Sequence, residues 1–401
     1  MRAGKRAGRV YSTSQDHIYG LRSLRTQLYE YHKRHAKMID FSGFEMPLWY
    51  RGIQTECLAV RNQAGIFDVS HMGRAFIKGP DSEAFLNYLT PNDVSKLKPG
   101  KAHYSVLCNE RGGVVDDVVL LRVDEDVFLL VFNAGNRGKD LKWIEAHRKG
   151  YDVDVRHVSD EVAMIAIQGP KAREVVESAC RSDVSSVGRF ECGNLNFNGI
   201  DCIASGTGYT GEDGLEIFVP DATLENPGSA VKVWDTLLAV GEGEGLTPCG
   251  LGARDVLRLE AGMCLYGNEL KESITPFEAG IGFVVKLDKG VDFIGRKALQ
   301  EQKLQGMPRI RVGVKLLERG VPRKGNSILH NGEVIGEVTS GTYSPILKCG
   351  IAMGYVKPEF REPGVKVELK IRERYVNGEV SSMPFYDVTV YGWRRIRTNH
   401  K

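Results

Sequence analysis

The alternation of apolar and polar positions between residues 103 and 132 predicts a three-stranded antiparallel meander. The expected strands cover residues 103–108, 114–123 and 127–132. Segment 109–113 ends in Gly112 and Gly113, which supply the positive φ angles of a tight hairpin, and an acidic turn at 124–126 reverses the chain again. Two adjacent aspartates, Asp116 and Asp117, stand inside the second strand, in one of the most apolar stretches of the chain.

These two aspartates allow two interpretations. Strict alternation would place Asp117 on one face of the strand with Val115 and Val119, and Asp116 on the other face. Both acids could be surface charges on an edge strand, where charge suppresses pairing between sheet edges. The valines on both faces instead favour a strand covered on both sides. In that case one acid faces a site, where partial burial would raise its pKa, and the other needs a partner or water.

Further along the chain the same theme is repeated. Residues 81–89 and 138–148 have the pattern of helices, the first with an acidic cap at Asp81. A strand at 161–168 and a helix at 171–179 follow. Two such blocks in series predict an α+β body with antiparallel sheets.

Beyond residue 302 the pattern changes to short strands. Segments 309–317, 332–340, 350–356, 365–371 and 379–385 are strand-like, and Asn-Gly pairs at 331–332 and 377–378 are typical of hairpin turns. We expect a small β-barrel or sandwich at 302–401, after a first region at 16–301.

Composition is that of a globular protein, with 42% hydrophobic and 26% charged residues. No apolar run is long enough for a membrane helix. The net charge of +3 is uneven, because residues 1–37 hold nine basic and two acidic side chains and leave about −4 on the rest. We therefore expect neither a membrane nor a nucleic acid as a partner.

Residues 1–15 are basic, rich in Ser, Ala and Gly, and free of acids, without the apolar core of a secretory signal. This composition predicts a mitochondrial transit peptide and a mature protein in the mitochondrial matrix, although a disordered basic tail has the same composition. The eight cysteines form no Cys-x-x-Cys pair, and the nine histidines show no metal-ligand spacing. We expect reduced cysteines and no metal site.

Two further motifs bear on chemistry. Residues 206–211 fit Gly-x-Gly-x-x-Gly, but a strand follows rather than the helix that a dinucleotide site requires, so we predict a glycine-rich hairpin that presents Tyr209. Residues 249–262 hold the clearest helix start in the chain, with Arg254 and Arg258 on one face. They could bind an anion or form ion pairs with Asp255 and Glu260.

In this order, segments 38–50, 67–72, 109–117, 207–214, 250–262, 265–267 and 339–345 closely resemble the aminomethyltransferase (T-protein) family of the glycine cleavage system, over nearly the whole chain after residue 15. The resemblance implies a three-domain cloverleaf: two α+β folate-binding subdomains with antiparallel sheets and a small C-terminal β-barrel. It also implies transfer of the methylene of an aminomethyl-lipoyl carrier, the H-protein, to tetrahydrofolate. The products are ammonia and 5,10-methylenetetrahydrofolate.

By position, the resemblance implies that Asp117 is the catalytic acid. The implied folate-binding residues are Met72, Tyr104, Asn133, Tyr209, Glu216 and Arg254. A carboxylate there would orient the attacking folate nitrogen and stabilise positive charge at the methylene carbon.

Two alternatives share the fold. A folate-dependent demethylase, or the folate half of a sarcosine-type oxidase, would usually carry an additional flavin domain, for which this chain has no room. A non-enzymatic folate-binding factor of iron-sulfur assembly would carry a Lys-Gly-Cys-Tyr-x-Gly motif, which residues 261–267 lack. The transferase is the favoured interpretation.

Overall fold

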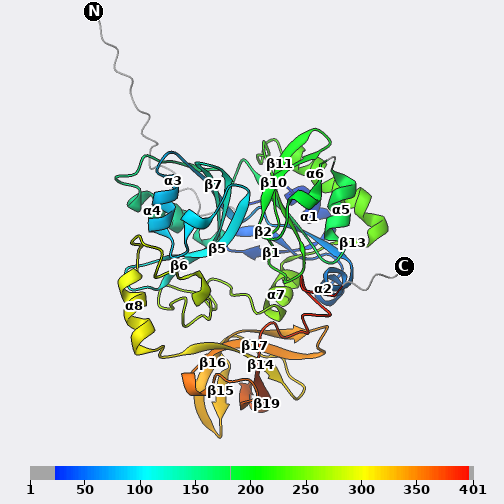
Figure 1. The fold of residues 1–401 in the computed structure, drawn as a ribbon. Coiled ribbons are helices and arrows are strands. Elements are labelled where there is room, and N and C mark those ends of the chain that lie inside the picture. Colours follow the sequence, from blue (N-terminus) through cyan, green and yellow to red (C-terminus); the bar gives the residue numbers. More distant parts are fainter. Residues whose placement is uncertain (1–22, 181, 397–401) are drawn as a thin grey trace, which may run out of the picture.

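The computed structural model describes residues 23–180 and 182–396, so the predicted leader at 1–15 lies outside the described residues. Two α+β parts lie side by side, and a β-barrel lies beneath them in the view of Figure 1. The fold is therefore the mixed α+β class with a C-terminal barrel, as the sequence predicts. Within the described ranges no helix is long and apolar enough to cross a bilayer.

The first part is built on a five-stranded antiparallel sheet that contains the predicted meander. Its order is β5 (Lys101–Cys108), β6 (Val114–Asp124), β7 (Val127–Phe132), β4 (Gly73–Lys78), β8 (Asp154–His157). Helices α3 (Ser82–Leu89) and α4 (Arg137–His147) bury Phe85 and Ile144 against one face. Asp81 occupies the N-cap position of α3, as predicted, but its carboxylate makes no capping bond and accepts instead from the Asp152 amide at 2.8 Å.

The second part is a six-stranded sheet. Its order is β10 (Cys192–Phe197), β11 (Ile200–Ser205), β12 (Gly214–Val219), β9 (Ala163–Gln168), β3 (Ala64–Asp68), β13 (Leu246–Pro248), antiparallel except for the β3–β13 pair. Helices α5 (Ala172–Ala179) and α6 (Gly228–Gly241) cover its outer face with Val175 and the fully buried Trp234.

The inner faces of the two sheets pack on each other. Leu121 and Val131 from the first sheet meet Met164 and Phe218 from the second in one buried cluster. Because each sheet is covered on both sides, its central strands contain long apolar runs. This arrangement excludes the edge-strand interpretation of the aspartate pair, since β6 lies between β5 and β7.

A β-bulge in β6 changes the faces that strict alternation predicts. Leu107 is opposite Asp116 and Cys108 is opposite Val114, so Val115 is the extra residue of the bulge. Val115 consequently packs in the core on the Asp116 side, and its predicted position beside Asp117 is wrong.

The C-terminal barrel is closed, in the order β14 (Ile310–Leu316), β17 (Cys349–Val356), β16 (Glu333–Ser344), β15 (Ser327–His330), β18 (Lys366–Ile371), β19 (Arg374–Ser381). The sequence missed the four-residue β15 and placed the last strand too late. The Asn331-Gly332 turn is confirmed, with φ angles of 50° and 83°. The turn predicted at Asn377-Gly378 is wrong: these residues pair with both β18 and β14, and the chain turns at Arg372 instead, where φ is 57°.

The remaining elements connect these parts. They are α1 (Tyr29–His35), the β1 (Lys37–Phe41) and β2 (Phe44–Trp49) hairpin, α2 (Ile53–Asn62), α7 (Leu251–Glu260), α8 (Arg296–Gln305) and the 3₁₀ turns η1 (Val94–Lys96), η2 (Ala134–Asn136), η3 (Val184–Ser186), η4 (Glu242–Glu244), η5 (Gly282–Val284) and η6 (Pro358–Phe360). The domain boundary predicted between residues 301 and 302 falls inside α8 and stays a prediction.

A buried ionic cluster joins α2, α7 and the glycine-rich hairpin. Arg61 of α2 is fully buried and forms ion pairs with Glu212 at 3.0 Å and Glu260 at 2.8 Å. The C-terminal segment reaches the same cluster, because Arg395 pairs with Glu212 and the Trp393 amide donates to the Gly211 carbonyl at 2.9 Å. The glycine-rich hairpin is thus fixed from several sides.

Candidate active site

A cavity of about 890 Å³ lies where the two sheets, α7 and the barrel meet. Its size is in the range of small-molecule sites. All seven residues predicted from the sequence line it: Met72, Tyr104, Asp117, Asn133, Tyr209, Glu216 and Arg254. Their contributions to binding and chemistry stay predictions, but their common location is a property of the fold.

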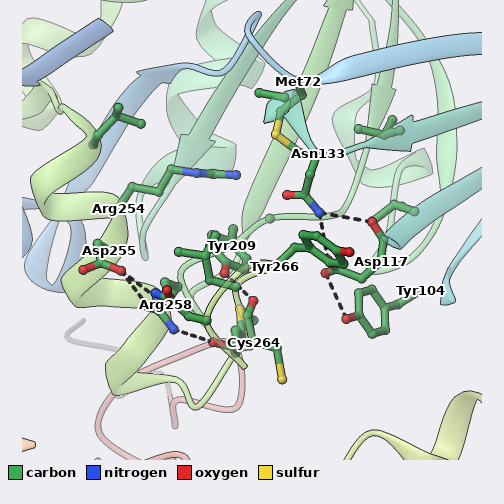
Figure 2. A pocket seen from close by; sticks show the side chains of 18 of the residues that line it. Met72, Tyr104, Asp117, Asn133, Tyr209, Arg254, Asp255, Arg258, Cys264 and Tyr266 are labelled. Carbon is green, nitrogen blue, oxygen red and sulfur yellow. Dashed lines mark hydrogen bonds and ion pairs between the residues drawn. The ribbon is translucent and has the colours of Figure 1, made fainter. Parts of the chain in front are cut away.

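Asp117 projects from β6 into this cavity and is held by two donors (Figure 2). The Tyr104 hydroxyl donates to its Oδ2 at 3.0 Å, and Asn133 Nδ2 donates to its Oδ1 at 2.8 Å. Tyr104 lies on the neighbouring strand two residues from Val106, the direct partner of Asp117, so both side chains share a face of the sheet. Asn133 directly follows β7.

The surroundings of Asp117 change its acidity. Burial, followed by the charge of Asp116, raises its pKa to about 7, while the hydrogen bonds from Tyr104 and Asn133 act in the opposite direction. Near neutral pH this group therefore exists in both protonation states. It can accept a proton or stabilise a cation without a large free-energy cost.

Asp116 has a different environment on the opposite face. It is fully buried and accepts hydrogen bonds from the Asn133 amide at 2.9 Å, Asn133 Nδ2 at 2.9 Å and Asn136 Nδ2 at 2.7 Å. The expectation that one acid faces a site and the other requires a partner is thus met. Asn133 Nδ2 contacts both carboxylates and couples their positions.

The wall opposite Asp117 comes from the glycine-rich hairpin and α7. The segment after β11 leads into strand β12 rather than a helix, as predicted. The Tyr209 hydroxyl donates to the Cys264 carbonyl, and the Arg254 guanidinium lies 4.6 Å from the Tyr209 ring centroid. Arg254 extends from the first turn of α7 toward the cavity in Figure 2. Its charge is placed against an aromatic face in a desolvated site.

Glu216, on β12, also faces this wall. Its Oε2 accepts a hydrogen bond from the Thr207 hydroxyl at 2.5 Å, and burial raises the pKa of its carboxyl group. Arg254 opposes that rise. Glu216 can therefore present an acceptor, or a protonated donor, to a polar ring edge.

Arg258 has a structural environment different from that of Arg254. It is 1% exposed and forms ion pairs with Asp255 at 2.7 Å and Glu269 at 3.0 Å. The ion-paired interpretation therefore holds for Arg258 with Asp255, whereas Glu260 pairs with Arg61 instead.

Further residues line the cavity beside the seven predicted ones. Tyr266 accepts a hydrogen bond from Lys139 Nζ at 2.8 Å, and it lies in the 265–267 motif that carried the resemblance without a function. His71 lines the cavity, and its Nδ1 is buried without a partner among the described residues. Phe283 lies at the cavity with its ring centroid 6.3 Å from that of Tyr104. No signal in the sequence marked Phe283.

Comparison with known proteins adds independent support. The GCVT N-terminal domain family matches residues 28–289, and the glycine cleavage T-protein C-terminal barrel domain matches residues 309–387. The aminomethyltransferase of Alkaliphilus metalliredigens (strain QYMF) is 45% identical over 366 residues, which cover 91% of this chain and 98% of that protein. The chain belongs to the glycine cleavage T-protein family.

Further relatives agree with this assignment. The aminomethyltransferase of Geobacillus sp. (strain WCH70) is 45% identical over 364 residues, 90% of this chain and 98% of that protein. The crystal structure of the glycine cleavage system aminomethyltransferase T from Bartonella henselae is 36% identical. It superposes with a TM-score of 0.84 and covers 91% of this chain and 98% of that one. The predicted family, the fold and the activity, an aminomethyltransferase of the glycine cleavage system, are confirmed.

Proposed function

We propose that this T-protein transfers the methylene group of an aminomethyl-lipoyl carrier to tetrahydrofolate in the cavity, with Asp117 as the catalytic acid. The observation that carries this assignment is a single ionisable group with a pKa near 7, held by Tyr104 and Asn133 and facing a cavity of ligand size. The family match supports use of tetrahydrofolate. The alternatives, a demethylase and an assembly factor, have no comparable support among the relatives, which are named aminomethyltransferases.

The residues fit a flat, polar ring with an acidic and a basic edge. Tyr209 and Met72 supply apolar walls, and Glu216 supplies a carboxyl group suited to an amide and amino edge. Arg254 offers a desolvated cation to the polar end of the ligand. Tetrahydrofolate supplies the ring nitrogens that accept the carbon.

Asp117 would act by accepting a hydrogen bond from the attacking nitrogen. In the transfer, two folate nitrogens form bonds to the methylene carbon, and the bonds from that carbon to the amino group and to the lipoyl sulfur break. The two protons lost by the folate nitrogens leave with ammonia and with the lipoyl thiol of the carrier. The Asp117 carboxylate would hold the nucleophile in line and stabilise positive charge on the carbon, and Tyr104 and Asn133 would keep its two oxygens in place.

The test is turnover of a neutral variant. Asp117→Asn should abolish formation of 5,10-methylenetetrahydrofolate from loaded carrier, with little change in tetrahydrofolate binding. Asp154→Asn, an exposed position on β8 of the same sheet, is the matched control. Release of ammonia by Asp117→Asn at the rate of the parent protein would refute the catalytic assignment.

A lipoyl-bearing H-protein is the proposed carrier. The support is the family alone, since T-proteins of glycine cleavage act on a carrier-bound group. Two measurements would test it. The first titrates the protein with lipoylated and unlipoylated H-protein, and the second compares turnover of free aminomethyl-lipoamide with turnover of the loaded carrier. Equal turnover of these two substrates would argue against a specific partner.

We also propose that residues 1–15 direct the protein to the mitochondrial matrix, that residues 16–301 form the folate-binding region and that residues 302–401 form the barrel domain. The family matches at 28–289 and 309–387 support the division. The leader rests on its composition alone, since the relatives described above are bacterial. Fusion of residues 1–40 to a fluorescent protein would test targeting, and diffuse cytosolic fluorescence would contradict it.

A further inference from the structure

A third aspartate lies behind the pair in β6. Asp140, in the first turn of α4, is fully buried. Among the described residues, neither of its carboxyl oxygens accepts a hydrogen bond. An ionised carboxylate in that position would be strongly unfavourable. The position therefore requires either a donor or a proton.

The neighbour that explains Asp140 is Asp116. Asn136 donates to Asp116 at 2.7 Å, and Asp140 follows Asn136 by four residues, so both side chains extend from the same side of α4. Lys139 Nζ donates to the Val115 carbonyl at 2.5 Å, which holds α4 against the bulge of β6. The two buried carboxyl groups are neighbours that interact directly. The amide donors described above reach Asp116 and not Asp140.

We propose that Asp140 is a neutral carboxylic acid at physiological pH, that its hydroxyl donates to Asp116, and that it thereby serves as a positioning residue for Asp117. Burial, the hydrogen bond to Asp116 and the charge of Asp116 together raise the pKa of Asp140 to about 11. The two acids then share one negative charge, and Asp116 has a fourth donor in addition to the three amide groups.

This arrangement would act on Asp117 through Asn133. Asn133 Nδ2 donates to Asp116 Oδ1 at 2.9 Å and to Asp117 Oδ1 at 2.8 Å, so the orientation of Asp116 fixes the amide that orients Asp117. A second ionised carboxylate at Asp140 would raise the pKa of Asp117 beyond the effect of Asp116 alone. The other titratable groups around the three acids are Lys139, Tyr266, Tyr104, Tyr209 and Cys264.

The kinetic test compares two variants and rests on the proposed role of Asp117. Asp140→Asn keeps a neutral donor to Asp116 and should retain kcat within about threefold, with an unchanged acidic limb of the pH–rate profile. Asp140→Leu removes the donor. It should lower kcat on the order of ten- to a hundredfold with little change in the KM for tetrahydrofolate. The acidic limb should move to higher pH, because the charge of Asp116 is less compensated. Glu145→Gln, at an exposed position on the same helix, is the control.

A direct test does not depend on turnover. At pH 9 ordinary carboxyl groups are ionised, so an infrared difference spectrum of the parent protein minus Asp140→Asn should contain the C=O band of one neutral carboxylic acid. The same band should persist in Asp117→Asn. Its absence would overturn the proposal whatever the kinetics, as would an acidic limb that stays in place in a folded Asp140→Leu protein. If Asp140→Leu does not fold, the spectrum of Asp140→Asn decides alone. Full activity of Asp117→Asn would instead refute the proposed function and leave the band unaffected.

Discussion

Asp117→Asn should make the protein more stable above neutral pH while it removes activity. Burial and the charge of Asp116 raise the pKa of Asp117 from 3.8 to about 7 in the folded protein, so the folded state binds a proton that the unfolded state has lost. Between these two pKa values the stability of the parent protein falls as pH rises, and above pH 7 the full penalty of the buried charge is present. Asparagine carries no charge and avoids this penalty.

The magnitude follows from the two pKa values. Their difference corresponds to a ceiling of about 4 kcal/mol above pH 7. Asp117 is only half-buried, because it faces the cavity, so about 1–2 kcal/mol is the expected gain. The hydrogen bonds can be kept, because the side-chain oxygen of asparagine can accept from Asn133 while its amide donates to the rotatable Tyr104 hydroxyl.

The measurement is Tm by differential scanning fluorimetry at several pH values. The advantage of Asp117→Asn over the parent should be smallest near pH 5 and should grow until about pH 8. Asp154→Asn, the exposed control, should show no such growth. If the Tm difference between Asp117→Asn and the parent is constant from pH 5 to pH 8.5, Asp117 does not titrate near neutrality, and the argument for its chemistry fails.

Three further outcomes are expected. Arg254→Ala should weaken tetrahydrofolate binding by on the order of 2 kcal/mol through loss of a charge-assisted contact, measured by calorimetry; an unchanged Kd would rule out the contact. Tyr104→Phe removes a hydrogen bond that lowers the pKa of Asp117, so the acidic limb of kcat/KM should move to higher pH, and a fixed limb would contradict the assigned bond. Arg61→Leu leaves two buried glutamates without their main partner and should destabilise the fold by about 3–5 kcal/mol, seen as a lower Tm; a Tm equal to that of the parent would show that the glutamates are compensated elsewhere.

Local patterns predicted the features that depend on neighbours in the chain. The meander, the hairpin at Asn331-Gly332 and the strand after the glycine-rich turn follow from alternation and turn residues, and all are present. Asn377-Gly378 has the same turn composition, but strands on both sides pair with it, and these partners are distant in sequence. Turn propensity is overridden where hydrogen bonds within a closed barrel favour a strand at the same residues.

The residues of the site also divide into those that local sequence patterns predict and those that depend on partners distant in sequence. Asp117, Arg254 and Tyr209 could be located from their motifs because special residues surround them. Asp140 could not, because an aspartate among Lys139, Leu141 and Lys142 has the pattern of an exposed helix position, and only the packing of α4 on β6 buries it. Likewise, both arginines of α7 line the cavity, but only Arg258 is ion-paired with Glu269, a residue of the loop that follows the helix.

Two adjacent acids occupy opposite faces of β6 through strand alternation, and the bulge just before them fixes which face each one takes. By inserting Val115 it sets which residues of the strand after the hairpin face the α4 side, where Asp116 is buried, and which face the cavity, where Asp117 projects. Burial of Asp116 is tolerated because three amide bonds, each charge-assisted, offset its desolvation. Its fixed negative charge then adds to burial in raising the pKa of Asp117, so the acidity of the cavity-facing group is set in part by the residue next to it, which never reaches the cavity.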